Sequence, residues 1–159
     1  MEQTSSYTYF SIFSNGKMGG RGWEGTEAGA FEPDDITEIL NIEPFAKWKK
    51  GDVMERHPQG WLYQFSRWSA EKSDIDRIDA GKQCRESIKN LKNKVPELLE
   101  IKSLYDVLFR IMIVPEIRGE KVLLYFEKEI IDFCHCTGTT IDVDMYVFSA
   151  SPVDAAVQN

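Results

Sequence analysis

FEPDDITEIL, residues 31–40, has a near-copy later in the chain, FEKEIIDFC at residues 126–134. In each stretch a phenylalanine precedes a glutamate at the expected N-cap, and an isoleucine follows the phenylalanine by five positions (Phe31 and Ile36; Phe126 and Ile131). That spacing is typical of a hydrophobic staple, in which the residue before the cap packs against the fourth helical residue. The two stretches therefore predict helices over about 33–41 and about 127–137.

Similar strand-like runs flank both predicted helices. YFSIFS and YQFSRWSA surround the first, and LFRIMIV and YVFSASP surround the second. We expect strands over residues 7–14, 61–69, 106–114 and 139–149, with a shorter one at 121–126. Two βαβ halves in one largely antiparallel sheet are typical of an α+β, ferredoxin-like sandwich. Between the halves, residues 74–102 predict one long extra helix that is broken or kinked at Pro96.

The chain of 159 residues has the length of one domain. We expect a single domain over 1–159, with its core at about 7–149 and a frayed tail at 150–159. Residues 15–30 hold six of the eleven glycines, and this composition predicts a flexible loop between the first strand and the first helix. Because longer loops cost little closure entropy, we expect this loop to be dispensable for stability.

Charge and cysteine content restrict the function classes. A net charge of −7 disfavours binding to nucleic acid or to anionic membranes, because both reward a basic surface. The sequence opens without a basic segment followed by an apolar run, so a secretory signal is not expected. No stretch approaches the roughly 20 apolar residues of a membrane span. Three cysteines do not indicate a disulfide framework, and we expect a cytoplasmic protein.

Seven short motifs occur in the same order as in a known family. The chain resembles the DUF4279 family, a group of small bacterial proteins of unknown function, over about residues 7–149. The resemblance rests on YFSIF, PDDITEILNIEP, WKKGD, FSRWS, YDV, KEIIDF and IDVDMYVFS. The family usually passes from the first strand to the helix through a short turn, whereas this chain inserts the glycine-rich loop. The resemblance implies a fold and offers no established reaction.

Two motifs that invite a chemical interpretation are better explained without one. Residues 20–25 spell GxGxxG, but the run lies away from the helix start and is followed by acidic residues that repel phosphate. Cys134, His135 and Cys136 are adjacent, yet alternate residues of a helix point in different directions, so they do not easily share one tetrahedral ion. Neither histidine faces a nucleophile in an evident triad. We therefore expect no cofactor, no metal and no nucleophilic triad.

Alternation along the predicted strands indicates a sheet face with aromatic and charged side chains. Asp142 and Asp144 lie two residues apart on one face, about 6.6 Å from each other, and can form a carboxylate pair or simply face solvent. The same alternation and the internal repeat add further members to this face: Tyr9, Tyr63, Arg67, Arg110 and Tyr146. Such a face can bind a ligand, a partner chain or the long helix of its own chain.

WKKGD, residues 48–52, is the remaining candidate. Trp48 can fill the edge of the core while the following residues turn the chain. Alternatively, Trp48 and Lys50 belong to a basic-aromatic patch that grips an acidic partner or a phosphorylated small molecule.

These features support a first hypothesis of a non-catalytic binding module that holds a partner protein, of an immunity or regulatory type. A small-molecule-binding domain that uses the open sheet face is the alternative. An enzyme that uses Asp142 and Asp144 with Arg67 or Arg110 is a third. A homodimer is compatible with each of them.

Overall fold

The computed structural model describes residues 2–149, so the predicted tail at 150–159 lies outside the described part of the chain. The structure is mixed α+β. Its helices are α1 (Pro33–Leu40), α2 (Ala80–Ile88), α3 (Val95–Leu104) and α4 (Lys128–Thr137). Its strands are β1 (Ser5–Ser14), β2 (Gly16–Gly19), β3 (Gly22–Gly25), β4 (Ala46–Trp48), β5 (Arg67–Ser69), β6 (Val107–Ile117), β7 (Thr139–Val143) and β8 (Tyr146–Val147).

The main sheet has the strand order β4-β5-β1-β6-β7, with β8 also paired to β6. The pairs β4–β5, β5–β1 and β1–β6 are antiparallel, whereas β7 and β8 run parallel to β6. The sheet is therefore mostly antiparallel. The ferredoxin-like pseudo-repeat is not confirmed, because β5 lies antiparallel beside β1 while β7 lies parallel beside β6, so the two halves differ in topology.

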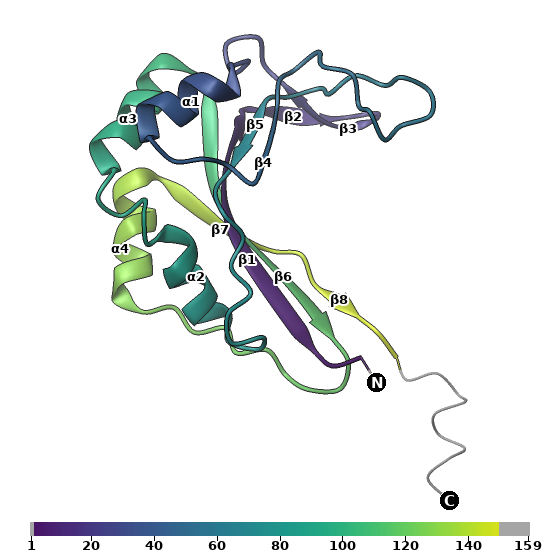
Figure 1. Cartoon of the computed structure of the whole chain (residues 1–159), viewed down its shortest axis with the longest axis vertical. Coiled ribbons are helices and arrows are strands. Elements are labelled where there is room, and N and C mark those ends of the chain that lie inside the picture. The colour runs from purple at the N-terminus through teal and green to yellow at the C-terminus, as the bar shows by residue number, and fades with distance from the viewer. Residues whose placement is uncertain (1, 150–159) are drawn as a thin grey trace, which may run out of the picture.

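All four helices cover one face of this sheet (Figure 1). The helix-covered face of β1 and β6 contributes the centre of the core, where Phe10, Ile12, Phe109 and Ile111 are almost completely buried. The opposite face carries no helix among residues 2–149 (Figure 1). No helix in the same residues is long and apolar enough to cross a membrane.

The two predicted staples have different outcomes. At α1, Phe31 and Ile36 are both buried in the core cluster, which is the burial expected of a staple. At α4, Ile131 is 56% exposed and the neighbouring Ile130 is fully buried. The second staple is therefore wrong, because α4 turns Ile130 toward the sheet. Gly138 ends α4 in the left-handed conformation, with a φ of 65°.

Three predicted elements are shorter than expected. The single long helix is wrong: α2 ends at Ile88 and α3 begins at Val95, the residue before Pro96. The strand expected at 61–69 is reduced to β5, because residues before Arg67 have no partner strand in the main sheet. The segment 121–126 forms only an isolated bridge, between Leu123 and Asp79.

The glycine-rich segment is a β-hairpin, not an unstructured loop. β2 and β3 pair antiparallel and project from one end of the sheet on its helix-free side (Figure 1). Trp23 Nε1 donates to the Ser14 carbonyl at 2.9 Å, and Lys50 Nζ donates to the Gly25 carbonyl at 2.8 Å. These contacts from β1 and from residue 50 give the hairpin a fixed position that glycine content alone does not predict.

Candidate functional site on the open face

The face of the main sheet opposite the helices, here called the open face, collects most of the predicted site residues. Register places Tyr9 of β1 beside Met112 of β6, and Met112 beside Asp142 of β7. Ser11 and Arg110 form the next row. Because cross-strand partners point to the same side of a sheet, strands β1, β6 and β7 present these side chains on one surface.

Arg67 of β5 lies at the centre of an aromatic cluster on this face. Its guanidinium carbon is 5.0 Å from the ring centroid of Tyr9 and 4.9 Å from that of Trp48, distances typical of cation–π contacts. Arg67 Nε donates to Ser69 Oγ at 2.7 Å. Among residues 2–149, no ion pair and no further side-chain hydrogen bond of this guanidinium is found. The cation is therefore oriented by its neighbours and keeps its terminal N–H groups available.

Aromatic rings extend the cluster on both sides of Arg67. Trp48 stacks on Tyr63, with centroids 4.5 Å apart and an interplanar angle of 11°. On the other side, Tyr9 contacts the edge of Phe45 at 5.5 Å. Tyr63 thus reaches the open face from the loop that precedes β5, and not from a strand as its sequence pattern predicts. Seven of these rings are called the aromatic cluster below: Tyr7, Tyr9, Phe13, Phe45, Trp48, Tyr63 and Phe65.

Arg110 and the predicted carboxylate pair lie beside this cluster. Arg110 forms an ion pair with Asp142 at 3.0 Å, and its guanidinium carbon lies 4.4 Å from the ring centroid of Phe13. Asp144 accepts a hydrogen bond from the Tyr146 hydroxyl at 2.9 Å. The two aspartates are both exposed and each has a different partner.

Two buried donors of the open face have no acceptor among the described residues. Trp48 Nε1 and Arg110 Nε are both inaccessible to solvent and form no hydrogen bond there. The terminal nitrogens of Arg67 likewise form no hydrogen bond within residues 2–149. Unpaired buried donors are costly.

The surroundings of Tyr7 and Tyr146 raise the pKa of both phenols, which are protonated at neutral pH even at their ordinary pKa. Burial raises the pKa of Tyr7 most, with smaller contributions from Tyr9, Glu116 and Asp144. The hydrogen bond to Asp144 is the largest cause of the raised pKa of Tyr146. Both hydroxyls are therefore hydrogen-bond donors at neutral pH.

The lysines of WKKGD are engaged within the chain. Lys50 Nζ contacts Glu27 in addition to the Gly25 carbonyl, and the flanking lysines pair with acidic residues of α1 and its cap: Lys47 with Asp34, and Lys49 with Glu32. The structure thus brings Trp48 to the aromatic cluster but uses Lys50 to hold the hairpin. This pairing neutralises the predicted basic patch.

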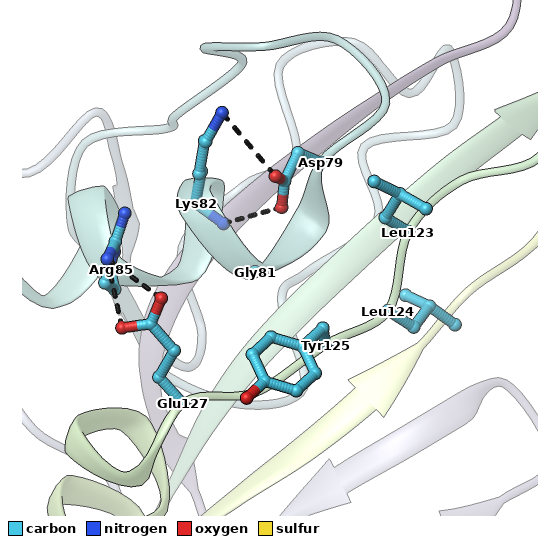
Figure 2. Close-up of a pocket in the computed structure, with 8 residues that line it drawn as sticks. All are labelled: Asp79, Gly81, Lys82, Arg85, Leu123, Leu124, Tyr125 and Glu127. Atoms are coloured by element: carbon cyan, nitrogen blue, oxygen red, sulfur yellow. Dashed lines mark hydrogen bonds and ion pairs between the residues drawn. The ribbon is translucent and has the colours of Figure 1, made fainter.

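The other candidates lie away from the open face. Among residues 2–149, no group of three His, Cys, Asp or Glu side chains can hold a metal ion. Cys134 is half-buried, while His135 and Cys136 are exposed. A pocket of about 420 Å³ lies between α2 and the segment after β6, lined by residues that include Arg85, Leu124 and Tyr125 (Figure 2). Its charged groups are paired, Arg85 with Glu127 and Lys82 with Asp79.

Sequence analysis did not include Phe13, Phe45 or Lys72 in the site. Lys72 Nζ lies 4.5 Å from the ring centroid of Tyr7. Phe13 continues the alternation of Tyr9 and Ser11, so the same period of two, extended by one more step, predicts that it lies on this face. Phe45 and Lys72 lie outside the strands, and no periodic pattern marks them.

The fold and the site define a mixed α+β protein that has one helix-covered and one open sheet face. The chain belongs to the family described as "Domain of unknown function (DUF4279)", whose sequence model matches residues 3–148. Comparison with curated proteins found no match. Comparison with solved structures found none either.

Proposed function

We propose that the chain is a non-catalytic binding module whose open face holds an acidic segment of a partner protein, with Arg67 at the centre. The observation that carries this proposal is the position of the Arg67 guanidinium between Tyr9 and Trp48. A guanidinium with free terminal N–H groups can bind a carboxylate through two parallel hydrogen bonds. Since Ser69 and the two rings already fix the side chain, little rotamer entropy is lost on binding.

The surroundings of Arg67 support a protein ligand. Tyrosine and tryptophan give a large rigid contact area with polar tips, and such residues with arginine dominate binding energy at interfaces. The three described pockets are lined mainly by residues outside the aromatic cluster, and only the smallest, about 200 Å³, includes Tyr63 and Phe65. A broad face without a deep cavity suits an extended segment better than a small molecule, which is usually enclosed in a pocket.

The carboxylates support a binding role over an acid–base role. Asp142 is paired with Arg110, and Asp144 accepts from Tyr146. Paired in this way, they fix the border of the open face and repel acidic groups there. A partner carboxylate is thereby directed toward Arg67 instead of the β7 edge.

Peptide binding tests the proposal directly. Fluorescein-labelled, terminally blocked peptides that contain Glu and Trp, and matched peptides with Lys in place of Glu, are titrated with the protein and followed by anisotropy. We expect binding of the Glu peptides only, and Arg67→Gln weakens it by at least about tenfold. Arg56→Gln, which removes an exposed loop arginine, is the matched control and leaves binding unchanged. Equal binding of both peptide sets, or an unchanged affinity of Arg67→Gln, overturns the proposal.

A further inference from the structure

The segment of residues 120–127, here called the strap, lies between β6 and α4 and runs along α2 (Figure 2). Three consecutive large side chains of the strap are exposed: Leu123 at 54%, Leu124 at 45% and Tyr125 at 71%. In an extended segment, successive side chains point to opposite sides. Apolar surface is therefore uncovered on both sides of the strap, away from the open face.

One edge of the strap is bonded to the chain that leads into α2. Leu123 N donates to the Ile78 carbonyl at 2.7 Å, and Ala80 N donates to the Leu123 carbonyl at 3.0 Å. The Tyr125 carbonyl lies so close to Gly81 that a methyl group there would collide with it. The backbone groups of Leu123 and Tyr125 thus face α2.

The other edge of the strap has free backbone groups. Backbone N–H and C=O groups alternate in direction along an extended segment, so those of Val122, Leu124 and Phe126 point away from α2. No hydrogen bond of these backbone groups is found among residues 2–149. An unpaired edge with apolar side chains is a template for the addition of another strand.

We propose that the strap pairs antiparallel with the strap of a second copy of this chain, about a two-fold axis at Leu124. The sequence Lys-Val-Leu-Leu-Tyr-Phe-Glu, residues 121–127, is complementary to itself in that register. Lys121 lies opposite Glu127 of the second copy, and Leu123 lies opposite its Tyr125. A two-fold axis repeats every one of these contacts, as in an isologous dimer.

The ion pairs that the strap already makes are compatible with this dimer. Both carboxylate oxygens of Glu127 accept a hydrogen bond from Arg85 Nη1, at 3.0 Å each. Glu120 forms an ion pair with Arg77 at 2.6 Å. A carboxylate accepts several hydrogen bonds at once, so Glu127 can bind Lys121 of the second copy as well. Lys121 has no ion pair among residues 2–149. Because the paired straps are short, the interface is smaller than that of most stable dimers, and a weak, concentration-dependent dimer follows.

Sedimentation velocity across a concentration series, with charge-reversed variants, tests the strap dimer. Lys121→Glu places Glu opposite Glu127, and Glu127→Lys places Lys opposite Lys121. Each variant alone therefore has two like-charge pairs across the axis, and we expect its dimerisation to weaken at least about tenfold. An equimolar mixture of the two variants restores both pairs, so we expect it to form a heterodimer at the concentration at which the wild-type chain dimerises. Arg56→Glu changes the net charge by the same amount as Lys121→Glu and leaves dimerisation unchanged.

Circular dichroism of each variant verifies that it is folded before the comparison is made. Native mass spectrometry of the mixture identifies the heterodimer by mass. A wild-type chain that stays monomeric up to about 1 mM, the concentration at which even a weak complex forms, overturns the proposal. A dimer that tolerates both single reversals also overturns it, because another surface then forms the interface.

Discussion

The guanidinium of Arg67 lies 4.9 Å from the ring centroid of Trp48, and the ring of Trp48 also stacks on that of Tyr63, with centroids 4.5 Å apart. Strand β5, the adjacent edge strand β4 and the loop between them each supply one of these three side chains. Edge strands of three residues have little backbone pairing to hold them, so the stacked side chains stabilise this end of the sheet. The residues proposed to bind a partner therefore also support the sheet edge.

Truncation of Trp48 tests that structural contribution. Trp48→Ala removes the Tyr63 stack and the contact with Arg67, and we expect the free energy of unfolding to fall by about 2–4 kcal/mol. Urea denaturation followed by circular dichroism measures the change.

Trp61 provides the matched control, because it is 37% exposed and lies in the loop that precedes β5. Trp61→Ala should lower the free energy of unfolding by less than about 1 kcal/mol. If the two variants lose equal stability, the stack does not support β4 and β5.

Deletion of the hairpin should lower the melting temperature, contrary to what its glycine content predicts. Removal of residues 17–28 eliminates the Trp23 hydrogen bond to Ser14 and the hydrogen bond of Thr26 Oγ1 to Asp106, at 2.9 Å each. The Lys50 contacts with Gly25 and Glu27 are lost as well. Differential scanning calorimetry measures the shift, and we expect a decrease of at least about 4 °C, which corresponds to roughly 1 kcal/mol for a domain of this size. An unchanged melting temperature would restore the interpretation of a dispensable loop.

A glycine substitution in α2 tests how closely the strap packs. Gly81→Ala should raise helix propensity by about 1 kcal/mol, but its methyl group collides with the Tyr125 carbonyl. A backbone collision typically costs about 1–3 kcal/mol, so we expect net destabilisation in denaturant unfolding. Gly20→Ala is the control, since a methyl group there meets no atom within 4 Å. Stabilisation by Gly81→Ala would mean that the strap lies further from α2.

The buried thiol of Cys84 makes stability depend on alkaline pH. Burial is the main cause that raises the pKa of Cys84 to about 12. Because the unfolded thiol ionises near pH 8.5, the unfolded state gains thiolate first as the pH rises. The Cys84 contribution is complete below that value and is lost progressively as the pH rises toward 12, by at most about 1.4 kcal/mol per pH unit.

Comparison with Cys84→Ala isolates this dependence from that of tyrosines and lysines. Chemical denaturation between pH 7.5 and 10 (a window chosen around the ordinary thiol pKa) should give a steeper loss of stability for the wild type than for the variant. Parallel curves would show that the thiol ionises without unfolding.

Side-chain alternation predicts the open face where strands have partners, and fails where they do not. Tyr9, Arg110 and Asp142 lie in strands that pair along the main sheet, and a period of two places them on one side. Tyr63 belongs to an equally strand-like run, but that run has no neighbouring strand in the main sheet before Arg67. Its side chain reaches the face through a stack on Trp48, which local sequence cannot indicate.

The helix ends are likewise predictable from local sequence only where tertiary packing agrees with it. The staple spacing of Phe31 and Ile36 coincides with real burial, but the same spacing at Phe126 and Ile131 does not. Either Ile130 or Ile131 can satisfy the apolar pattern, and the packing of α4 on the sheet decides between them. The interruption between α2 and α3 likewise depends on tertiary packing, because Leu91, within the interruption, is itself buried in the core.

The central claim is that Arg67 is the carboxylate-binding centre of the open face, and nuclear magnetic resonance tests it most directly. The side-chain resonances of Arg67 and the indole N–H of Trp48 are followed while a terminally blocked Glu-Trp peptide is added. Both resonances should shift in proportion to binding, and the shifts should disappear at high salt, which screens exposed charge pairs, and in Arg67→Gln. Peptide-induced shifts that leave Arg67 and Trp48 unchanged and map to the helix-covered side of the molecule would contradict the claim.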